Sequence, residues 1–109
     1  MIGSDVIRGY VDTILLSLLL EGPDYGYSLQ KRVTQLTNGL YQLKETTLYS
    51  AFARLESGEY LTSFSGEETQ GRKRTYYRIT DKGRALYRDK CAEWTLVQQI
   101  IQPFIKKGD

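Results

Sequence analysis

Two short segments, residues 60–64 and 75–79, interrupt a chain whose other hydrophobic residues follow helical spacing. Both segments are rich in aromatic and β-branched residues, which strands prefer, so they predict a β-hairpin. The residues between them are polar and include two glycines, which predicts a projecting loop rather than a two-residue turn. A chain of 109 residues is long enough for one domain, so this hairpin must pack against the surrounding helices.

Hydrophobic residues at helical spacing predict three helices before the hairpin and one after it. The expected helices cover residues 5–20, residues 25–37 with Asp24 as N-cap, a segment that ends near residue 57, and residues 82–105 with a cap at Thr80 and Asp81. This order predicts an α+β fold, mainly α: a winged helix-turn-helix with a long C-terminal dimerisation helix. We expect a DNA-binding region over residues 1–80 and a dimerisation helix over residues 81–109, within one structural domain.

The third expected helix has a polar face beside its hydrophobic one. Leu48, Phe52 and Leu55 can anchor it in a core. The polar residues left around its start and on another face are Lys44, Thr46, Thr47, Tyr49, Ser50 and Arg54. Hydroxyl groups near a helix start can bond phosphates or base edges, and methyl or aromatic groups can pack on thymine. Taken alone, the same hydroxyls are equally well explained as solvated residues.

The hairpin carries the densest positive charge in the sequence. Between residues 70 and 78 there is no acid, and the basic residues are Arg72, Lys73, Arg74 and Arg78. On a hairpin beside a polar helix face, such charge suits a phosphate backbone or a minor groove. A solvated charged loop is the alternative for this segment by itself.

Composition argues against several other classes of protein. There is no histidine, and the single Cys91 cannot form an intrachain disulfide, so we expect no metal site, no cofactor and no enzyme. The longest hydrophobic run is far too short to cross a bilayer, and no signal peptide is recognisable, which predicts a cytoplasmic protein with no membrane partner.

The motifs of the chain resemble those of PadR-type transcriptional repressors, in particular a short subgroup with one C-terminal helix. The motifs that carry the resemblance are Gly22-Pro23, Tyr25-Gly26-Tyr27, Thr47-Leu48-Tyr49, Arg54-Leu55-Glu56, Gly71-Arg72-Lys73-Arg74, Tyr76-Tyr77-Arg78-Ile79-Thr80 and Gly83. Each motif is weak by itself, whereas their order and spacing over almost the whole chain are specific.

The resemblance implies a homodimer that inserts paired third helices into successive major grooves of a palindromic operator in double-stranded DNA. By position, the polar residues of the third helix would face DNA. The hairpin of each subunit, which forms the wing, would contact the backbone or minor groove, and Tyr25 and Ser28 would lie near phosphate. The family often has serine or asparagine in place of Lys44 and proline in place of Ser50. We therefore expect no side-chain cap at the third helix, and an operator sequence cannot be transferred from a relative.

The last helix extends its apolar residues beyond the wing, where little of the domain is left to cover them. The residues concerned are Trp94, Val97, Ile101, Phe104 and Ile105. We expect a second copy of the chain to cover them in a symmetric dimer. The alternative is that the helix folds back on its own core.

Trp94 has a second interpretation, because the resemblance is closest to a multidrug-responsive member of the subgroup. In that protein an aromatic pair at the dimer centre sandwiches flat hydrophobic compounds. The resemblance implies an aromatic small-molecule effector at Trp94, with Val6, Tyr10, Thr13, Val97 and Gln98 as lining residues. Simple packing of the tryptophan is the alternative.

A function from another class fits the same expected fold. A winged helix could serve as a protein-interaction module without specific DNA binding. The basic segment 72–74 favours DNA, and salt dependence separates the two hypotheses, because DNA binding weakens steeply as salt rises.

Overall fold

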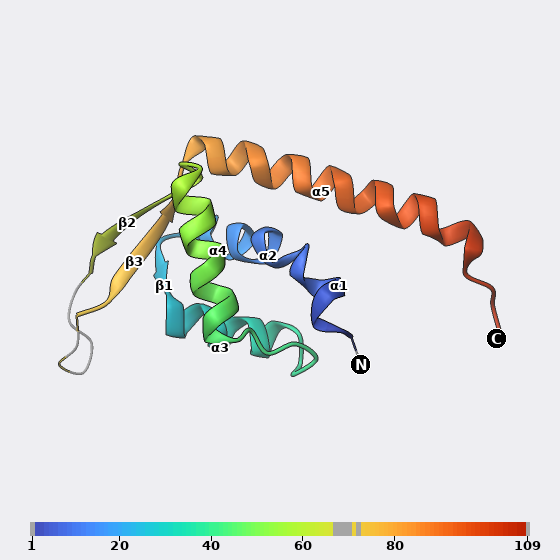
Figure 1. Ribbon diagram of the computed structural model, residues 1–109, viewed down its shortest axis with the longest axis horizontal. Coiled ribbons are helices and arrows are strands. Elements are labelled where there is room, and N and C mark those ends of the chain that lie inside the picture. The colour runs from blue at the N-terminus through green and yellow to red at the C-terminus, as the bar shows by residue number, and fades with distance from the viewer. Residues whose placement is uncertain (1, 67–70, 72, 109) are drawn as a thin grey trace.

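The computed structural model confirms the predicted fold class, a mainly helical winged helix-turn-helix (Figure 1). It describes residues 2–66, 71 and 73–108. The elements are α1 (Ser4–Arg8), α2 (Val11–Leu19), β1 (Asp24–Tyr25), α3 (Gly26–Leu36), α4 (Glu45–Ser57), β2 (Leu61–Ser65), β3 (Thr75–Ile79), α5 (Asp81–Ile101) and the short 3-10 helix η1 (Gln102–Phe104).

The first predicted helix, over residues 5–20, is wrong as one element, because it is divided into α1 and α2. Gly9 ends α1 and Tyr10 precedes the first residue of α2. Glycine loses more conformational freedom in a helix than any other residue, which makes Gly9 a weak point in the helical run. No residue of α1 is buried, and Val6 is exposed, so the buried residues of this segment begin only at Val11.

The core is formed by hydrophobic residues from three helices and two strands, together with Leu43 from the segment between α3 and α4. Its buried members are Val11, Leu15, Leu16, Leu18, Leu19, Leu29, Val33, Leu43, Leu48, Ala51, Phe52, Leu55, Leu61, Tyr77 and Ile79. Phe52 of α4 stacks on Tyr77 of β3, with ring centroids 3.7 Å apart and an interplanar angle of 14°. The third helix is therefore held by Leu48, Phe52 and Leu55, as its spacing predicts.

The sheet has three antiparallel strands in the order β1-β3-β2. The predicted hairpin is confirmed, with β2 beginning one residue later than expected. Strand β1 was not predicted, because two residues are too short to show a periodic pattern.

Asp24 is not the N-cap of α3, contrary to the prediction. It lies in β1, and Tyr25 occupies the cap position. The Asp24 carboxylate is buried and accepts hydrogen bonds from the Tyr25 amide, the Ser28 hydroxyl and Arg32 Nη1. These bonds make it an internal link between β1 and α3.

Helix α5 begins at the predicted cap and extends far beyond the other elements, on the side opposite the hairpin (Figure 1). The Thr80 hydroxyl oxygen accepts a hydrogen bond from the Gly83 amide at 3.0 Å. Gly83 is the only buried residue in this helix, which otherwise meets the fold along α2 and β3. The regular helix ends at Ile101, four residues earlier than predicted, because Pro103 cannot continue the helical hydrogen bonds.

Candidate functional site

Helix α4 separates an anchored face from an exposed one. Among the predicted contact residues on α4, Thr46, Tyr49, Ser50 and Arg54 are exposed, and Thr47 is half-buried. Lys44 is the N-cap and makes no side-chain capping bond, as predicted. The first amides of α4 therefore remain available to an acceptor outside the helix.

A cavity of about 230 Å³ lies between the N-terminal region and this exposed face of α4. Its lining residues are Arg8, Val11, Thr46, Thr47, Ser50 and Arg54. The structure thus brings together four of the predicted α4 residues and adds Arg8, which sequence reasoning missed. Arg8 reaches this cavity because the N-terminal region lies beside α4, and no local pattern in the sequence indicated it.

Arg54 does not extend freely from α4, because Asp12 at the start of α2 binds its guanidinium. Arg54 Nη2 lies 2.5 Å from Asp12 Oδ1, and Arg54 Nε lies 3.3 Å from Asp12 Oδ2. The hydrogen bond to Asp12 raises the pKa of Arg54 above its ordinary value, so this side chain stays charged. Asp12 is also a residue that the sequence analysis did not single out.

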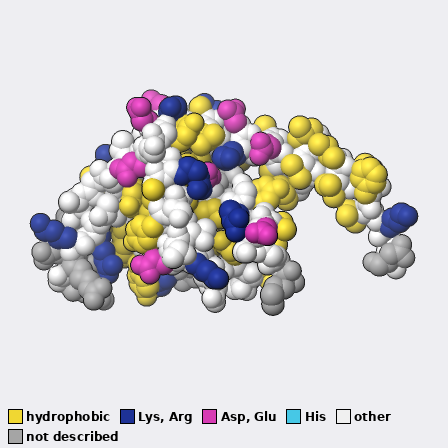
Figure 2. Space-filling model, viewed as in Figure 1, with side chains coloured by type: hydrophobic (Ala, Val, Ile, Leu, Met, Phe, Trp, Pro, Cys, Tyr) yellow, Lys and Arg dark blue, Asp and Glu magenta, His cyan; other side chains and the backbone are white. Residues whose placement is uncertain are grey.

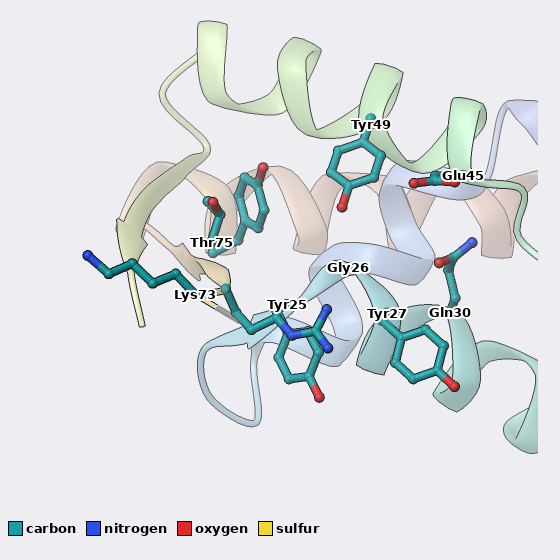
Figure 3. A pocket seen from close by; sticks show the side chains of 10 residues that line it. Tyr25, Gly26, Tyr27, Gln30, Glu45, Tyr49, Lys73 and Thr75 are labelled. Atoms are coloured by element: carbon teal, nitrogen blue, oxygen red, sulfur yellow. The ribbon is translucent and has the colours of Figure 1, made fainter. Parts of the chain in front are cut away.

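A second, larger cavity of about 820 Å³ lies on the other side of α4, between α3, α4 and the hairpin. Its lining residues are Tyr25, Gly26, Tyr27, Gln30, Glu45, Tyr49, Lys73, Arg74, Thr75 and Tyr77, most of which are labelled in Figure 3. Tyr25, Tyr49, Lys73 and Arg74 were predicted site residues, and the structure places all four here. Tyr27, Gln30 and Thr75 were not predicted.

Tyr49 reaches from α4 toward the start of α3 (Figure 3), where Gly26 leaves room for it. A Cβ atom at Gly26 would lie 2.8 Å from the Tyr49 hydroxyl oxygen and 3.2 Å from Leu48 Cδ2. Burial raises the pKa of Tyr77, so this phenol is neutral at physiological pH. The charged groups that line the cavity are therefore Lys73, Arg74 and Glu45.

One face of the sheet carries a continuous row of aromatic and guanidinium groups in contact with one another. The Arg74 guanidinium lies 5.1 Å from the centroid of Tyr25, and Tyr25 lies 5.3 Å from Tyr76. Tyr76 lies 5.7 Å from Phe64, over which the Arg78 guanidinium sits at 4.6 Å. The row crosses all three strands, and its two cation–π contacts fix the direction of Arg74 and Arg78.

The remaining predicted DNA-contact residues differ in how freely they are presented. Lys73 is exposed, whereas Arg74 is half-buried and its Nε atom has no hydrogen-bond partner within the described part of the chain. Ser28 is half-buried and donates its hydroxyl proton to Asp24 at 2.9 Å, which leaves only its lone pairs for another group. Arg72 lies outside the described residues.

The predicted effector residues lie around the junction of α2 with α5. Tyr10 and Trp94 meet edge to face, with ring centroids 5.1 Å apart and an interplanar angle of 79°. Trp94 is 44% exposed, Thr13 and Val97 are half-buried, and Val6 and Gln98 are exposed. The structure therefore brings one aromatic pair together, and it leaves much of the tryptophan uncovered by its own chain.

Within residues 2–66, 71 and 73–108, no cluster of three potential metal ligands occurs. No helix in the same ranges combines the length and hydrophobicity needed to cross a membrane.

Comparisons with known proteins agree with this geometry. Residues 15–89 match the family described as the transcriptional regulator PadR-like family. The structure of a transcriptional regulator from Clostridium thermocellum has a TM-score of 0.88 and 58% identity, covering 94% of this chain and 100% of that one. A PadR family transcription regulator from Clostridium difficile has a TM-score of 0.76 and 30% identity, covering 89% and 99% respectively. An uncharacterized protein from Lysinibacillus sphaericus is 42% identical over 106 residues, which are 97% of each chain.

Proposed function

This chain belongs to the PadR-like family of transcriptional regulators, and we propose that it is a repressor that binds palindromic operator DNA as a homodimer. Its relatives in this family are transcriptional regulators, and regulators of this family bind DNA. The observation that carries the more specific proposal is the exposed face of α4. The opposite face anchors this helix in the core, and arginine and tyrosine side chains line the cavities on either side of the exposed face.

Helix α4 is the proposed recognition element for the major groove. Its contact residues would be Lys44, Thr46, Thr47, Tyr49, Ser50 and Arg54, and Arg8 would add a cation beside them. The uncapped start of α4 supports this role, since free amides and the positive end of the helix dipole favour an anion such as phosphate.

The hairpin is the proposed contact to the DNA backbone or minor groove. Lys73 and Arg74 would bind phosphate there, together with Arg72. The ring of Tyr25 holds the Arg74 guanidinium by a cation–π contact. The Ser28 hydroxyl oxygen would lie near a DNA phosphate and could accept a hydrogen bond from a water molecule that bridges the two groups. The contact between Tyr25 in β1 and Arg74 supports a joint role for the start of α3 and the hairpin on one strand of DNA.

Dimerisation through α5 is proposed because this helix leaves large hydrophobic side chains uncovered. The exposed ones include Trp94, Leu96, Ile100, Ile101, Phe104 and Ile105, and Figure 2 shows hydrophobic side chains gathered over the outer half of α5. An exposed apolar stripe of this kind marks an interface, and a two-fold operator requires two copies of α4. Residues 81–109 would thus serve dimerisation and residues 1–80 DNA binding.

The aromatic pair of Tyr10 and Trp94 is the proposed site for a planar hydrophobic effector. Val6, Thr13, Val97 and Gln98 would line this site. An edge-to-face pair with an uncovered indole offers a surface on which a flat ring can stack. Such a compound would release DNA only if it preferred a subunit spacing different from that of the DNA-bound dimer.

The test is selection of bound sequences from a random pool of duplex DNA by the purified full chain. A palindromic consensus is expected, with an affinity that falls steeply as salt rises. Arg74→Ala should reduce the slope of log affinity against log salt concentration by about one, the change expected for the loss of one phosphate contact. A chain that selects no consensus and binds duplex equally weakly in dilute buffer would contradict the proposal and favour a protein-interaction module.

A further inference from the structure

The pairing of Asp12 with Arg54 suggests a role that no single element reveals. Arg54 is 56% exposed although it is paired, whereas the side chain of Asp12 is only 15% exposed. The carboxylate is therefore the fixed partner, and the guanidinium is the one that reaches solvent.

The geometry of the pair leaves one edge of the guanidinium available. Asp12 accepts from Nε and Nη2, which form one edge of the planar group. The end of the group, formed by Nη1 and the second N–H of Nη2, carries a fork of donors suited to two adjacent acceptors. Two neighbouring oxygens of a phosphate match this fork, and so do O6 and N7 of guanine.

The position of the pair supports this use of the free edge. Arg54 borders the cavity of about 230 Å³ together with the hydroxyl-bearing Thr47 and Ser50. All three belong to α4, and Arg8, which forms an ion pair with Asp5 at 3.1 Å, lines the same cavity. A group with adjacent acceptors would therefore meet both a fixed fork and hydroxyl donors there.

We propose that Asp12 is a positioning residue for DNA recognition: it holds Arg54 so that the free edge of the guanidinium points to a pair of acceptors on the DNA. This inference rests on the proposed function of α4. A freely rotating arginine must lose its side-chain freedom on binding, whereas an arginine already held by Asp12 has lost it in the folded protein.

The direction in which DNA affinity changes when Asp12 is removed distinguishes a positioning role from a purely electrostatic one. Removing an acid from a DNA-binding surface should tighten binding through electrostatics alone. If Asp12 positions Arg54, its removal should weaken binding instead. The matched control is Glu21→Gln, which removes one negative charge from another ion pair with arginine, Arg32 at 2.9 Å.

The experiment measures binding of Asp12→Asn, Arg54→Ala, Arg54→Lys, the double variant and Glu21→Gln to duplexes selected by the unaltered chain. Asp12→Asn is expected to weaken binding by about two- to tenfold, the cost of ordering one long side chain. Arg54→Ala should lose about five- to 150-fold, the range for a good bidentate contact. Arg54→Lys should not restore binding, because lysine lacks the fork. The double variant should bind like Arg54→Ala, and Glu21→Gln should bind at least as well as the unaltered chain.

Single-base variants of the duplex identify the source of the acceptors. Loss of discrimination at one base pair indicates a guanine edge, whereas an equal loss on all sequences with a salt slope reduced by about one indicates phosphate. Equal unfolding midpoints of Asp12→Asn and Glu21→Gln in urea would exclude a general loss of fold as the cause.

Three results would overturn the inference while leaving DNA binding intact. They are an Asp12→Asn variant that binds as tightly as Glu21→Gln, an Arg54→Ala variant with normal affinity, and losses that add fully in the double variant. An unaltered chain that selects no sequence would instead refute the proposed function itself, and this inference with it.

Discussion

The contact between Gly83 of α5 and the backbone of Tyr60 leads to a quantitative prediction for Gly83→Ala. A Cβ atom at Gly83 would lie 2.2 Å from the Tyr60 carbonyl oxygen and 2.8 Å from Ile79 Cγ1. The same carbonyl oxygen accepts a hydrogen bond from the Thr80 amide at 3.1 Å, so it cannot move without disturbing the cap of α5. A backbone atom has no alternative rotamer, and the helix start must shift.

The expected cost follows from three opposing contributions. Alanine gains about 1 kcal/mol over glycine in a helix interior. Overpacking costs about 1–3 kcal/mol, and a weakened hydrogen bond costs about 1 kcal/mol. The net loss in the free energy of unfolding is therefore about 1–3 kcal/mol, or a fall in Tm of about 5–15 °C for a domain of this size.

The assay is urea denaturation followed by circular dichroism, at one fixed protein concentration because an assembly would otherwise alter the midpoint. Gly9→Ala is the matched control. Gly9 has φ −67° and ψ −12°, which alanine adopts readily, and no atom of the described residues lies within 4 Å of its added Cβ. We expect Gly9→Ala to be neutral or stabilising by about 0.4–1 kcal/mol. If Gly83→Ala unfolds at the same urea concentration as Gly9→Ala, the argument from close approach is refuted.

Three further predictions concern the proposed DNA-binding, dimerisation and effector functions. Ile101→Asp should convert a dimer into monomers in sedimentation equilibrium, whereas Gln99→Asp, on the opposite side of α5, should not; a dimer retained by Ile101→Asp would exclude this face as the interface. Tyr25→Leu should weaken DNA binding and lower the salt slope as Arg74→Ala does, because the ring that holds Arg74 is lost. A normal salt slope in Tyr25→Leu would show that this contact has no part in binding. Tyr10→Leu should reduce the affinity for planar hydrophobic compounds, measured by quenching of the fluorescence of Trp94, the only tryptophan in the chain. Equal quenching in Tyr10→Leu and in the unaltered chain would place the compound elsewhere.

The sequence predicted those elements whose signals are local. Segments rich in aromatic and β-branched residues identified the hairpin, and the spacing of Leu48, Phe52 and Leu55 identified the buried face of α4. The break at Gly9 was missed because the hydrophobic repeat continues through it, although the residues of α1 are not buried.

The contacts that complete the candidate site could not be predicted in the same way. Asp12 and Arg54 are separated by 42 positions in the sequence, and only the packing of α2 on α4 brings them together. Arg8 and the pairing of Asp24 with Tyr77 depend on the tertiary fold in the same manner. Residue type therefore indicated which side chains suit DNA, and it did not indicate which of them are held by a neighbour.

The short strand β1 has a mechanical consequence for the proposed DNA complex. Tyr25 pairs with Tyr76 in the sheet and is also the N-cap of α3. The wing and the helix-turn-helix are therefore joined through a shared residue and not through a flexible segment. A tilt of the hairpin must turn the first residues of α3 with it. We expect the protein to tolerate little variation in the distance between the major groove and the neighbouring backbone, and DNA that cannot adopt that distance must itself bend to be bound.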